Sequence, residues 1–164
     1  MSTLIDLIQN SDLAVLIRED DYLFPIIESI HVLAILLVFG SIMVVDLRLM
    51  GLASAQRPVT RLTASILPLT WVAFVFAISA GGLMFISKAD KYWSNGFFET
   101  KMVLIAGAGL NMAIFHLVTG RDQAAWDLQS KPPLAARLAG GTSLLLWISI
   151  VACGRGIGFT MPVE

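Results

Sequence analysis

Four long apolar stretches, separated by polar connections, dominate the hydrophobic pattern of this chain. They cover residues 23–50, 62–87, 101–118 and 138–159. A helix rises about 1.5 Å per residue, so about 20 apolar residues cross a hydrocarbon layer of about 30 Å. Each stretch reaches the length that a transmembrane helix needs. The pattern therefore predicts four membrane-spanning helices.

The first stretch is apolar in its middle and polar near both ends. Glu28 and His31 lie near its start, and Asp46 and Arg48 lie near its end. The stretches follow one another through short connections, which favour antiparallel neighbours. The sequence thus predicts an all-α integral membrane protein, an up-down-up-down four-helix bundle formed by residues 23–159.

Residues 1–22 have a different character from the spans. They have no basic region at the start, and Asp6 and Asp12 interrupt their apolar pattern, which is not typical of a cleaved signal peptide. We expect short amphipathic helices at the membrane surface, broken near Asn10, with Ser11 capping the second helix.

The composition agrees with a membrane protein. Hydrophobic residues make up 57% of the chain and charged residues 14%, whereas soluble domains have about 45–50% and about 25%. The net charge of −1 gives no indication of a nucleic-acid partner. Because Cys153 is the single cysteine, a disulfide within the chain is excluded. The expected partners are the lipid bilayer and either further copies of the chain or a larger membrane complex.

The loop charges predict an orientation. The first and third connections are rich in basic residues, and both termini and the second connection are rich in acidic ones. Basic loops stay in the cytoplasm. We therefore expect both termini in the periplasm, with the protein in a bacterial inner membrane.

Two histidines, His31 and His116, lie inside predicted spans. His31 follows the start of the first helix closely, whereas His116 lies near the end of the third, which runs in the same direction. The offset along the membrane normal is roughly 15 Å. The two imidazoles therefore cannot ligate one haem iron within a chain, and two separate sites remain open.

A b-type haem needs an imidazole or a thioether as ligand, small residues around its ring and cations for its propionates. The candidate cofactor-binding residues are His31, His116, Arg155, Met84 and Met102, and the candidate metal ligands are His31 and His116. A second axial ligand would come from a methionine or from the same histidine of a second copy. Alternatively, His31 only bonds a neighbouring helix or Glu28, and no cofactor is bound.

Several patterns carry a resemblance: IHVLAILLVFGSIMVVDLRLMGL, GGLMFISKADKYW, FFETKMVLIAGAGLNMAIFH and SLLLWISIVACGR. Together they resemble uncharacterised bacterial four-helix inner-membrane proteins over most of residues 30–155. The layout is also similar to that of four-helix cytochromes b and copper-resistance membrane proteins. The resemblance implies the four-helix fold and suggests a function in redox chemistry or copper handling. It identifies no reaction.

Three functions follow from these features. The first is a membrane redox subunit that binds b-type haem and passes electrons to or from quinone or a periplasmic partner. The second is a non-catalytic anchor or assembly subunit of a larger complex. The third is copper handling through His31, Met84 and Met102, whose soft ligands suit Cu(I). The sequence shows no phosphate loop, nucleophile–base pair or zinc motif that would indicate an enzyme.

Overall fold

The computed structural model describes residues 2–53, 56–129 and 131–161. Four long helices dominate this part of the chain, and each is long and apolar enough to cross a membrane. They are α3 (Leu23–Leu49), α4 (Val59–Ser87), α6 (Gly96–Ile114) and α8 (Leu134–Thr160). The predicted four-helix architecture is confirmed, and the chain is a multi-pass membrane protein.

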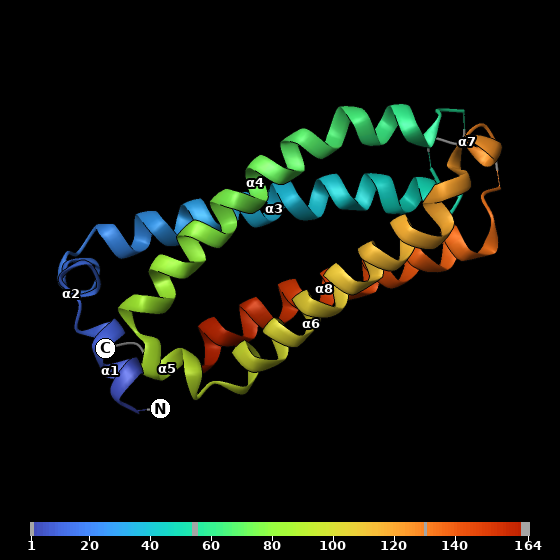
Figure 1. Ribbon diagram of the computed structural model, residues 1–164. Coiled ribbons are helices and arrows are strands. Elements are labelled where there is room, and N and C mark those ends of the chain that lie inside the picture. The colour runs from blue at the N-terminus through green and yellow to red at the C-terminus, as the bar shows by residue number, and fades with distance from the viewer. Residues whose placement is uncertain (1, 54–55, 130, 162–164) are drawn as a thin grey trace.

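Shorter elements connect and flank the long helices. They are α1 (Ser2–Gln9), α2 (Asp12–Glu19), α5 (Ala89–Trp93), the π-helical turn η1 (Phe115–Thr119), the 3-10 turn η2 (Gly120–Asp122) and α7 (Gln123–Trp126). The elements α1, α2, α5 and the end of α8 lie at one end of the molecule, called the terminal end below (Figure 1). The α3–α4 connection and α7 lie at the opposite end, called the loop end.

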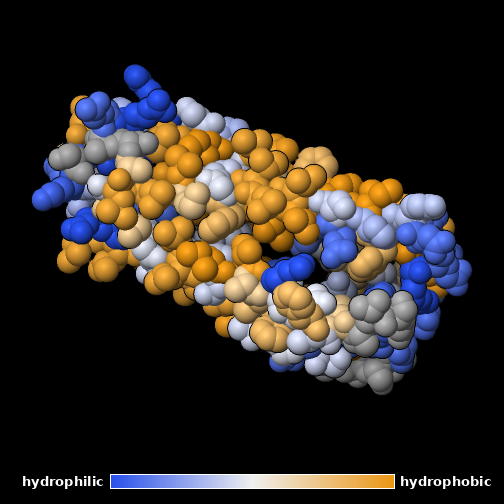
Figure 2. Space-filling view, turned by 180° about the vertical axis from the view of Figure 1, so that it is seen from behind, coloured by the Kyte–Doolittle hydropathy of each residue, from blue (hydrophilic) through white to orange (hydrophobic). Residues whose placement is uncertain are grey.

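The long helices form two antiparallel hairpins. Helix α3 packs along α4, α6 packs along α8, and contacts between α3 and α8 join the hairpins. Small side chains line these contacts, among them the buried Ala34, Ala73, Ala77 and Ala80. Large apolar side chains instead cover much of the outside, which is mostly hydrophobic between two more polar ends (Figure 2). Small residues inside and large ones outside are typical of helices packed in lipid.

The sequence predicts one or two short helices in the N-terminal segment, and the structure has two. Ser11 caps the second, as expected, through a hydrogen bond from the Ala14 N–H. Met1, the first residue of the predicted surface segment, lies outside the described residues. Arg18 donates a hydrogen bond to the Ser87 carbonyl at the end of α4, with N and O 3.3 Å apart. The segment is therefore docked onto the terminal end of the bundle.

Three long helices start earlier than their apolar stretches do. Helix α6 starts at Gly96 rather than at residue 101, because the Asn95 side chain accepts hydrogen bonds from the N–H groups of Phe97 and Phe98. Helices α4 and α8 start directly after Pro58 and Pro133. Capping groups and prolines set the first helical residue, whereas hydropathy marks only the part in lipid.

The aromatic residues around the second connection divide between the interior and the surface. Tyr92 is buried, and its ring packs against Phe85 and Phe98 with centroids 6.1 and 5.6 Å away. Trp93 and Phe97 remain exposed at the surface. Phe85, Tyr92 and Phe98 therefore form a small aromatic cluster at the terminal end.

Candidate functional site

His31 lies in the interface between α3 and α4. Its Nδ1 is 2.8 Å from the carbonyl oxygen of Ala77. A carbonyl can only accept, so Nδ1 carries the proton and Nε2 keeps a free lone pair. The ring lies against Gly81, where a Cβ would come within 2.8 Å of His31 Cε1. One bond and one glycine thus fix the orientation of the imidazole.

Lys101 of α6 lies close enough to His31 for their charges to interact, and it is likewise close to Cys153 of α8. Its Nζ reaches over α8 to within 3.7 Å of the Cβ position of Gly154. At about 1.5 Å per residue, the three residues lie within about 12 Å of the terminal ends of their helices. We call these three residues the His31 cluster.

Depth along the spans predicts that Lys101 lies at the same end as His31, where it could meet a haem propionate. Cys153 was expected only to be a small packing residue. Equal depth was the available signal, because Lys101, His31 and Cys153 are all close to the terminal ends of their spans. Their side-chain directions were not readable, since they depend on how α3 is rotated against α6 and α8.

His116 lies apart from the His31 cluster. It belongs to the turn η1, beyond the end of α6 and toward the loop end. Its side chain is exposed, its Nδ1 is 2.8 Å from the Met112 carbonyl of the same helix, and its ring stands edge-on to Phe115. The structure places the two histidines in different surroundings.

The remaining predicted site residues are spread over the terminal half. The Arg155 guanidinium lies 4.8 Å from the centroid of the Phe159 ring, and both side chains are exposed. Met84 is half-buried on α4, and Met102 on α6 is 42% exposed. No group of three or more His, Cys, Asp or Glu side chains positioned for a metal ion occurs in the described part of the chain.

A second polar cluster, at the loop end, is centred on Arg48. Its side chain is 0% exposed and donates to backbone carbonyls of both loops. Nε bonds Arg57 O at 2.8 Å, and Nη2 bonds Asp127 O at 3.0 Å and Gln129 O at 3.3 Å. Its Nη1 has no partner among the described residues. Arg48 therefore ties the α3–α4 loop to the loop before α8.

Asp46 lies one turn before the end of α3, in the contact with α8. It is 4% exposed, and the Ser143 side chain lies near its carboxyl group. Its Oδ2 has no hydrogen-bond partner in the described part of the chain. The helices approach closely here, since a Cβ at Gly140 would lie 2.9 Å from the Asp46 carbonyl oxygen.

Asp127 caps α4 from a distant part of the chain. Pro58 precedes this helix and has no side-chain donor or acceptor. The Asp127 carboxylate instead accepts hydrogen bonds from the Thr60 N–H at 2.9 Å and from the Thr60 hydroxyl. Burial would raise the pKa of Asp127, but these bonds and the Arg48 charge hold that pKa below its usual range.

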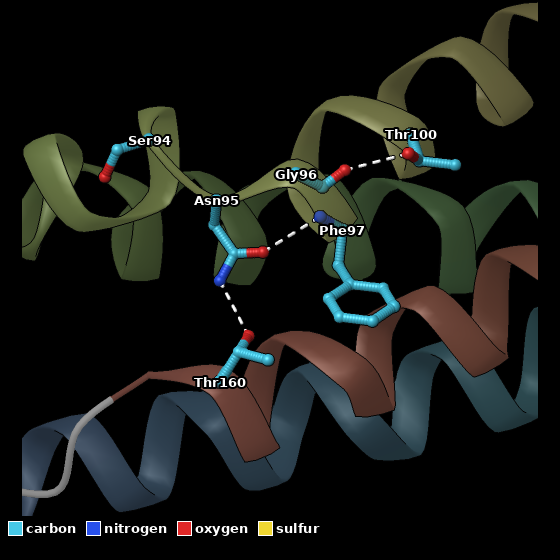
Figure 3. Close-up of a pocket in the computed structure, with 6 residues that line it drawn as sticks. All are labelled: Ser94, Asn95, Gly96, Phe97, Thr100 and Thr160. Carbon is cyan, nitrogen blue, oxygen red and sulfur yellow. Dashed lines mark hydrogen bonds between the residues drawn. The ribbon is translucent and has the colours of Figure 1, made fainter.

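A shallow surface pocket of about 590 Å³ lies at the terminal end. Figure 3 shows its lining residues, which come from the α5–α6 turn and the end of α8: Ser94, Asn95, Gly96, Phe97, Thr100 and Thr160. Asn95 Nδ2 donates to Thr160 Oγ1 at 2.8 Å, while its Oδ1 caps α6. These polar groups hold the ends of α6 and α8 together, and no lining residue is ionisable.

Three comparisons with known proteins complete this description. A family model described as "Family of unknown function (DUF6644)" matches residues 22–160. The searches of curated proteins and of solved structures gave no match. The matched range contains all four long helices and both polar clusters, and it begins after α2.

Proposed function

This chain belongs to a family of unknown function, DUF6644, and we propose that it is a membrane redox subunit that binds b-type haem through His31. The observation that supports the proposal is the bond from His31 Nδ1 to the Ala77 carbonyl. Histidines that ligate metals typically donate their other ring N–H to a carbonyl or carboxylate, which fixes the tautomer and the ring orientation. His31 meets this requirement within a membrane-spanning helix.

The chain's own residues fit one side of such a site. His31 Nε2 offers a lone pair, and Arg155 lies toward the terminal end, where it can meet propionates. Bound haem would supply one-electron transfer to or from quinone or a periplasmic partner. The second axial ligand would come from Met102, which is exposed on α6, or from His31 of a second copy.

An absorption spectrum of the purified protein, oxidised and then reduced, tests this function. We expect a Soret band and sharp bands after reduction, present in wild type and in His116→Ala and absent in His31→Ala. His116 is the matched control because its imidazole is exposed and bonded only to its own helix. A wild-type protein without these bands would contradict haem binding, and copper bound in its place would favour the copper-handling alternative.

The proposed orientation places the terminal end in the periplasm of a bacterial inner membrane. It is supported by the basic residues of the loop end, among them Arg57, Arg61 and Lys131. Reporter fusions test it: alkaline phosphatase fused after residue 161 should be active, and the same enzyme inserted near Arg57 should be inactive. The reverse pattern would contradict the orientation.

A second function, a non-catalytic anchor or assembly subunit, is supported by the surface of α1 and α2. These helices are docked on the bundle, yet Leu4, Leu7, Leu13 and Leu16 are each 49–67% exposed. Such leucines can lie in the lipid interface or bind a partner subunit. Co-purification of a larger enzyme, lost when these leucines are changed to serine and with no pigment on this chain, would favour this function.

A further inference from the structure

Lys101 lies within a helix that can span the membrane, and its ammonium has no partner in the described part of the chain. It lies on α6, five residues after Gly96, and its side chain is only half-exposed. Its Nζ lies near Gly154, where there is no side chain to accept a hydrogen bond. Among the described residues, Nζ has no hydrogen-bond or ion-pair partner. Ionisable groups at such positions are costly unless something neutralises them.

The groups near Lys101 do not neutralise its charge. His31 donates its Nδ1 proton to Ala77 and is not an anion. Cys153 is a half-buried free thiol. The nearby carboxylates, Glu28 and Glu99, belong to exposed side chains. The described residues therefore supply no negative charge that pairs with Lys101.

We propose that Lys101 binds the phosphate group of an anionic lipid at the flank of α6. At about 1.5 Å per residue, Lys101 lies roughly 8 Å below the start of α6, and a long lysine side chain can reach from there to the headgroup level. Lysine is a common phosphate ligand. Met102, the next residue along α6, is 42% exposed and offers an apolar surface to acyl chains.

Figure 2 shows a hollow on one face of the molecule, in the half toward the terminal end, with strongly hydrophilic atoms at its edge and hydrophobic surface around it. The Lys101 ammonium lies in that same half, between α6 and α8. The proposal does not require haem, because it concerns the lysine and not the His31 lone pair.

Thermal unfolding of the purified full-length protein in a neutral detergent tests the proposal. Phosphatidylglycerol, titrated into the sample, should raise the midpoint saturably by about 5 °C, and phosphatidylcholine should not. Lys101→Gln should abolish the rise, and Lys101→Arg should keep it. Lys131→Gln removes the same charge from an exposed position at the loop end and should respond as wild type does.

Titration with inorganic phosphate tests whether the phosphate group bound by Lys101 belongs to a lipid or to a free phosphate ion. If phosphate alone gives the full, Lys101-dependent rise, the ligand is a free phosphate, and the lipid assignment is overturned. An equal rise in wild type and Lys101→Gln with phosphatidylglycerol would overturn the site itself. In detergent alone, Lys101→Gln should unfold at or above the wild-type midpoint, since the ammonium has no partner to lose. A clearly lower midpoint would also contradict the proposal.

Discussion

At the scale of single residues, two adjacent glycines of α4 differ in what surrounds them. A Cβ at Gly81 would lie 2.8 Å from His31 Cε1, whereas a Cβ at Gly82 would have nothing within 4 Å. Gly81→Ala should therefore displace the imidazole and lower the free energy of unfolding by about 1–3 kcal/mol. Gly82→Ala should be neutral or stabilise the helix by up to about 1 kcal/mol.

Thermal unfolding of both variants checks this prediction. Each variant adds one methyl group to the same turn, so helix propensity changes equally in the two proteins. Equal midpoints would show that the His31 ring is not held against Gly81. A drop that is specific to Gly81→Ala would support the orientation of His31 on which the proposed haem site depends.

The lowered pKa of Asp127 predicts how the stability of the folded protein changes with pH. A carboxyl with a lower pKa in the folded state adds stability above its unfolded pKa of about 3.9, and this stability is lost as the pH falls through the folded pKa. Asp127→Asn keeps a capping oxygen but removes the negative charge at the start of α4, which should cost about 0.3–1 kcal/mol at pH 7. The difference from wild type should shrink below about pH 4.

Unfolding midpoints measured from pH 3 to pH 7 check this prediction. Asp21→Asn is the control, because it removes the same charge from an exposed carboxylate at the terminal end. A difference between Asp127→Asn and wild type that stays constant down to pH 3 would mean that the charge of Asp127 does not contribute to the cap of α4.

At the scale of elements, the close contact between α3 and α8 depends on Gly140. A Cβ there would lie 2.9 Å from the Asp46 carbonyl oxygen and 3.1 Å from Leu49 Cβ, whereas a Cβ at Gly141 would meet only the Met50 methyl group at 3.8 Å. Backbone atoms cannot move aside as flexible side chains can. Gly140→Ala should therefore push the helices apart and destabilise the protein by about 2 kcal/mol or more.

Gly141→Ala is the matched control for this contact, and we expect little change in it. Thermal unfolding in detergent measures both variants. Similar midpoints for Gly140→Ala and wild type would show that α3 and α8 are not packed backbone to backbone at this point.

A hydrogen bond joins the two helices of the second hairpin, α6 and α8. It runs from Asn111 Nδ2 to the Ala139 carbonyl over 3.0 Å.

At the scale of the whole molecule, Arg48 holds the two hairpins together at the loop end. Its guanidinium is fully buried and donates to three carbonyls from two loops. Arg48→Met should leave those three carbonyls without this donor and lower the free energy of unfolding by about 3 kcal/mol. Arg57→Ala should have little effect, because only the backbone of Arg57 takes part.

Unfolding midpoints of these two arginine variants check the prediction, and limited proteolysis locates the effect. We expect faster cleavage in the loop before α8 for Arg48→Met, since Asp127 and Gln129 lose their bonds to the guanidinium. Equal cleavage rates in wild type and Arg48→Met would show that this loop is held by other contacts.

The amino-acid sequence alone determined the number, type and approximate limits of the elements. Four apolar stretches predict four spans because a chain in lipid must satisfy its own backbone hydrogen bonds. The cap at Ser11 and the bond from Asn111 to another helix were also predictable, since short polar side chains at such positions have few other partners.

Only the tertiary structure decided which polar residues meet. His31 turns to Ala77 and Gly81 rather than to Glu28, Arg48 is buried between two loops, and Asp127 caps a helix 67 residues away. The rotation of each helix about its axis sets these contacts. In lipid that rotation follows from the fit of small residues between helices, and hydropathy, which is nearly uniform around these spans, does not encode it.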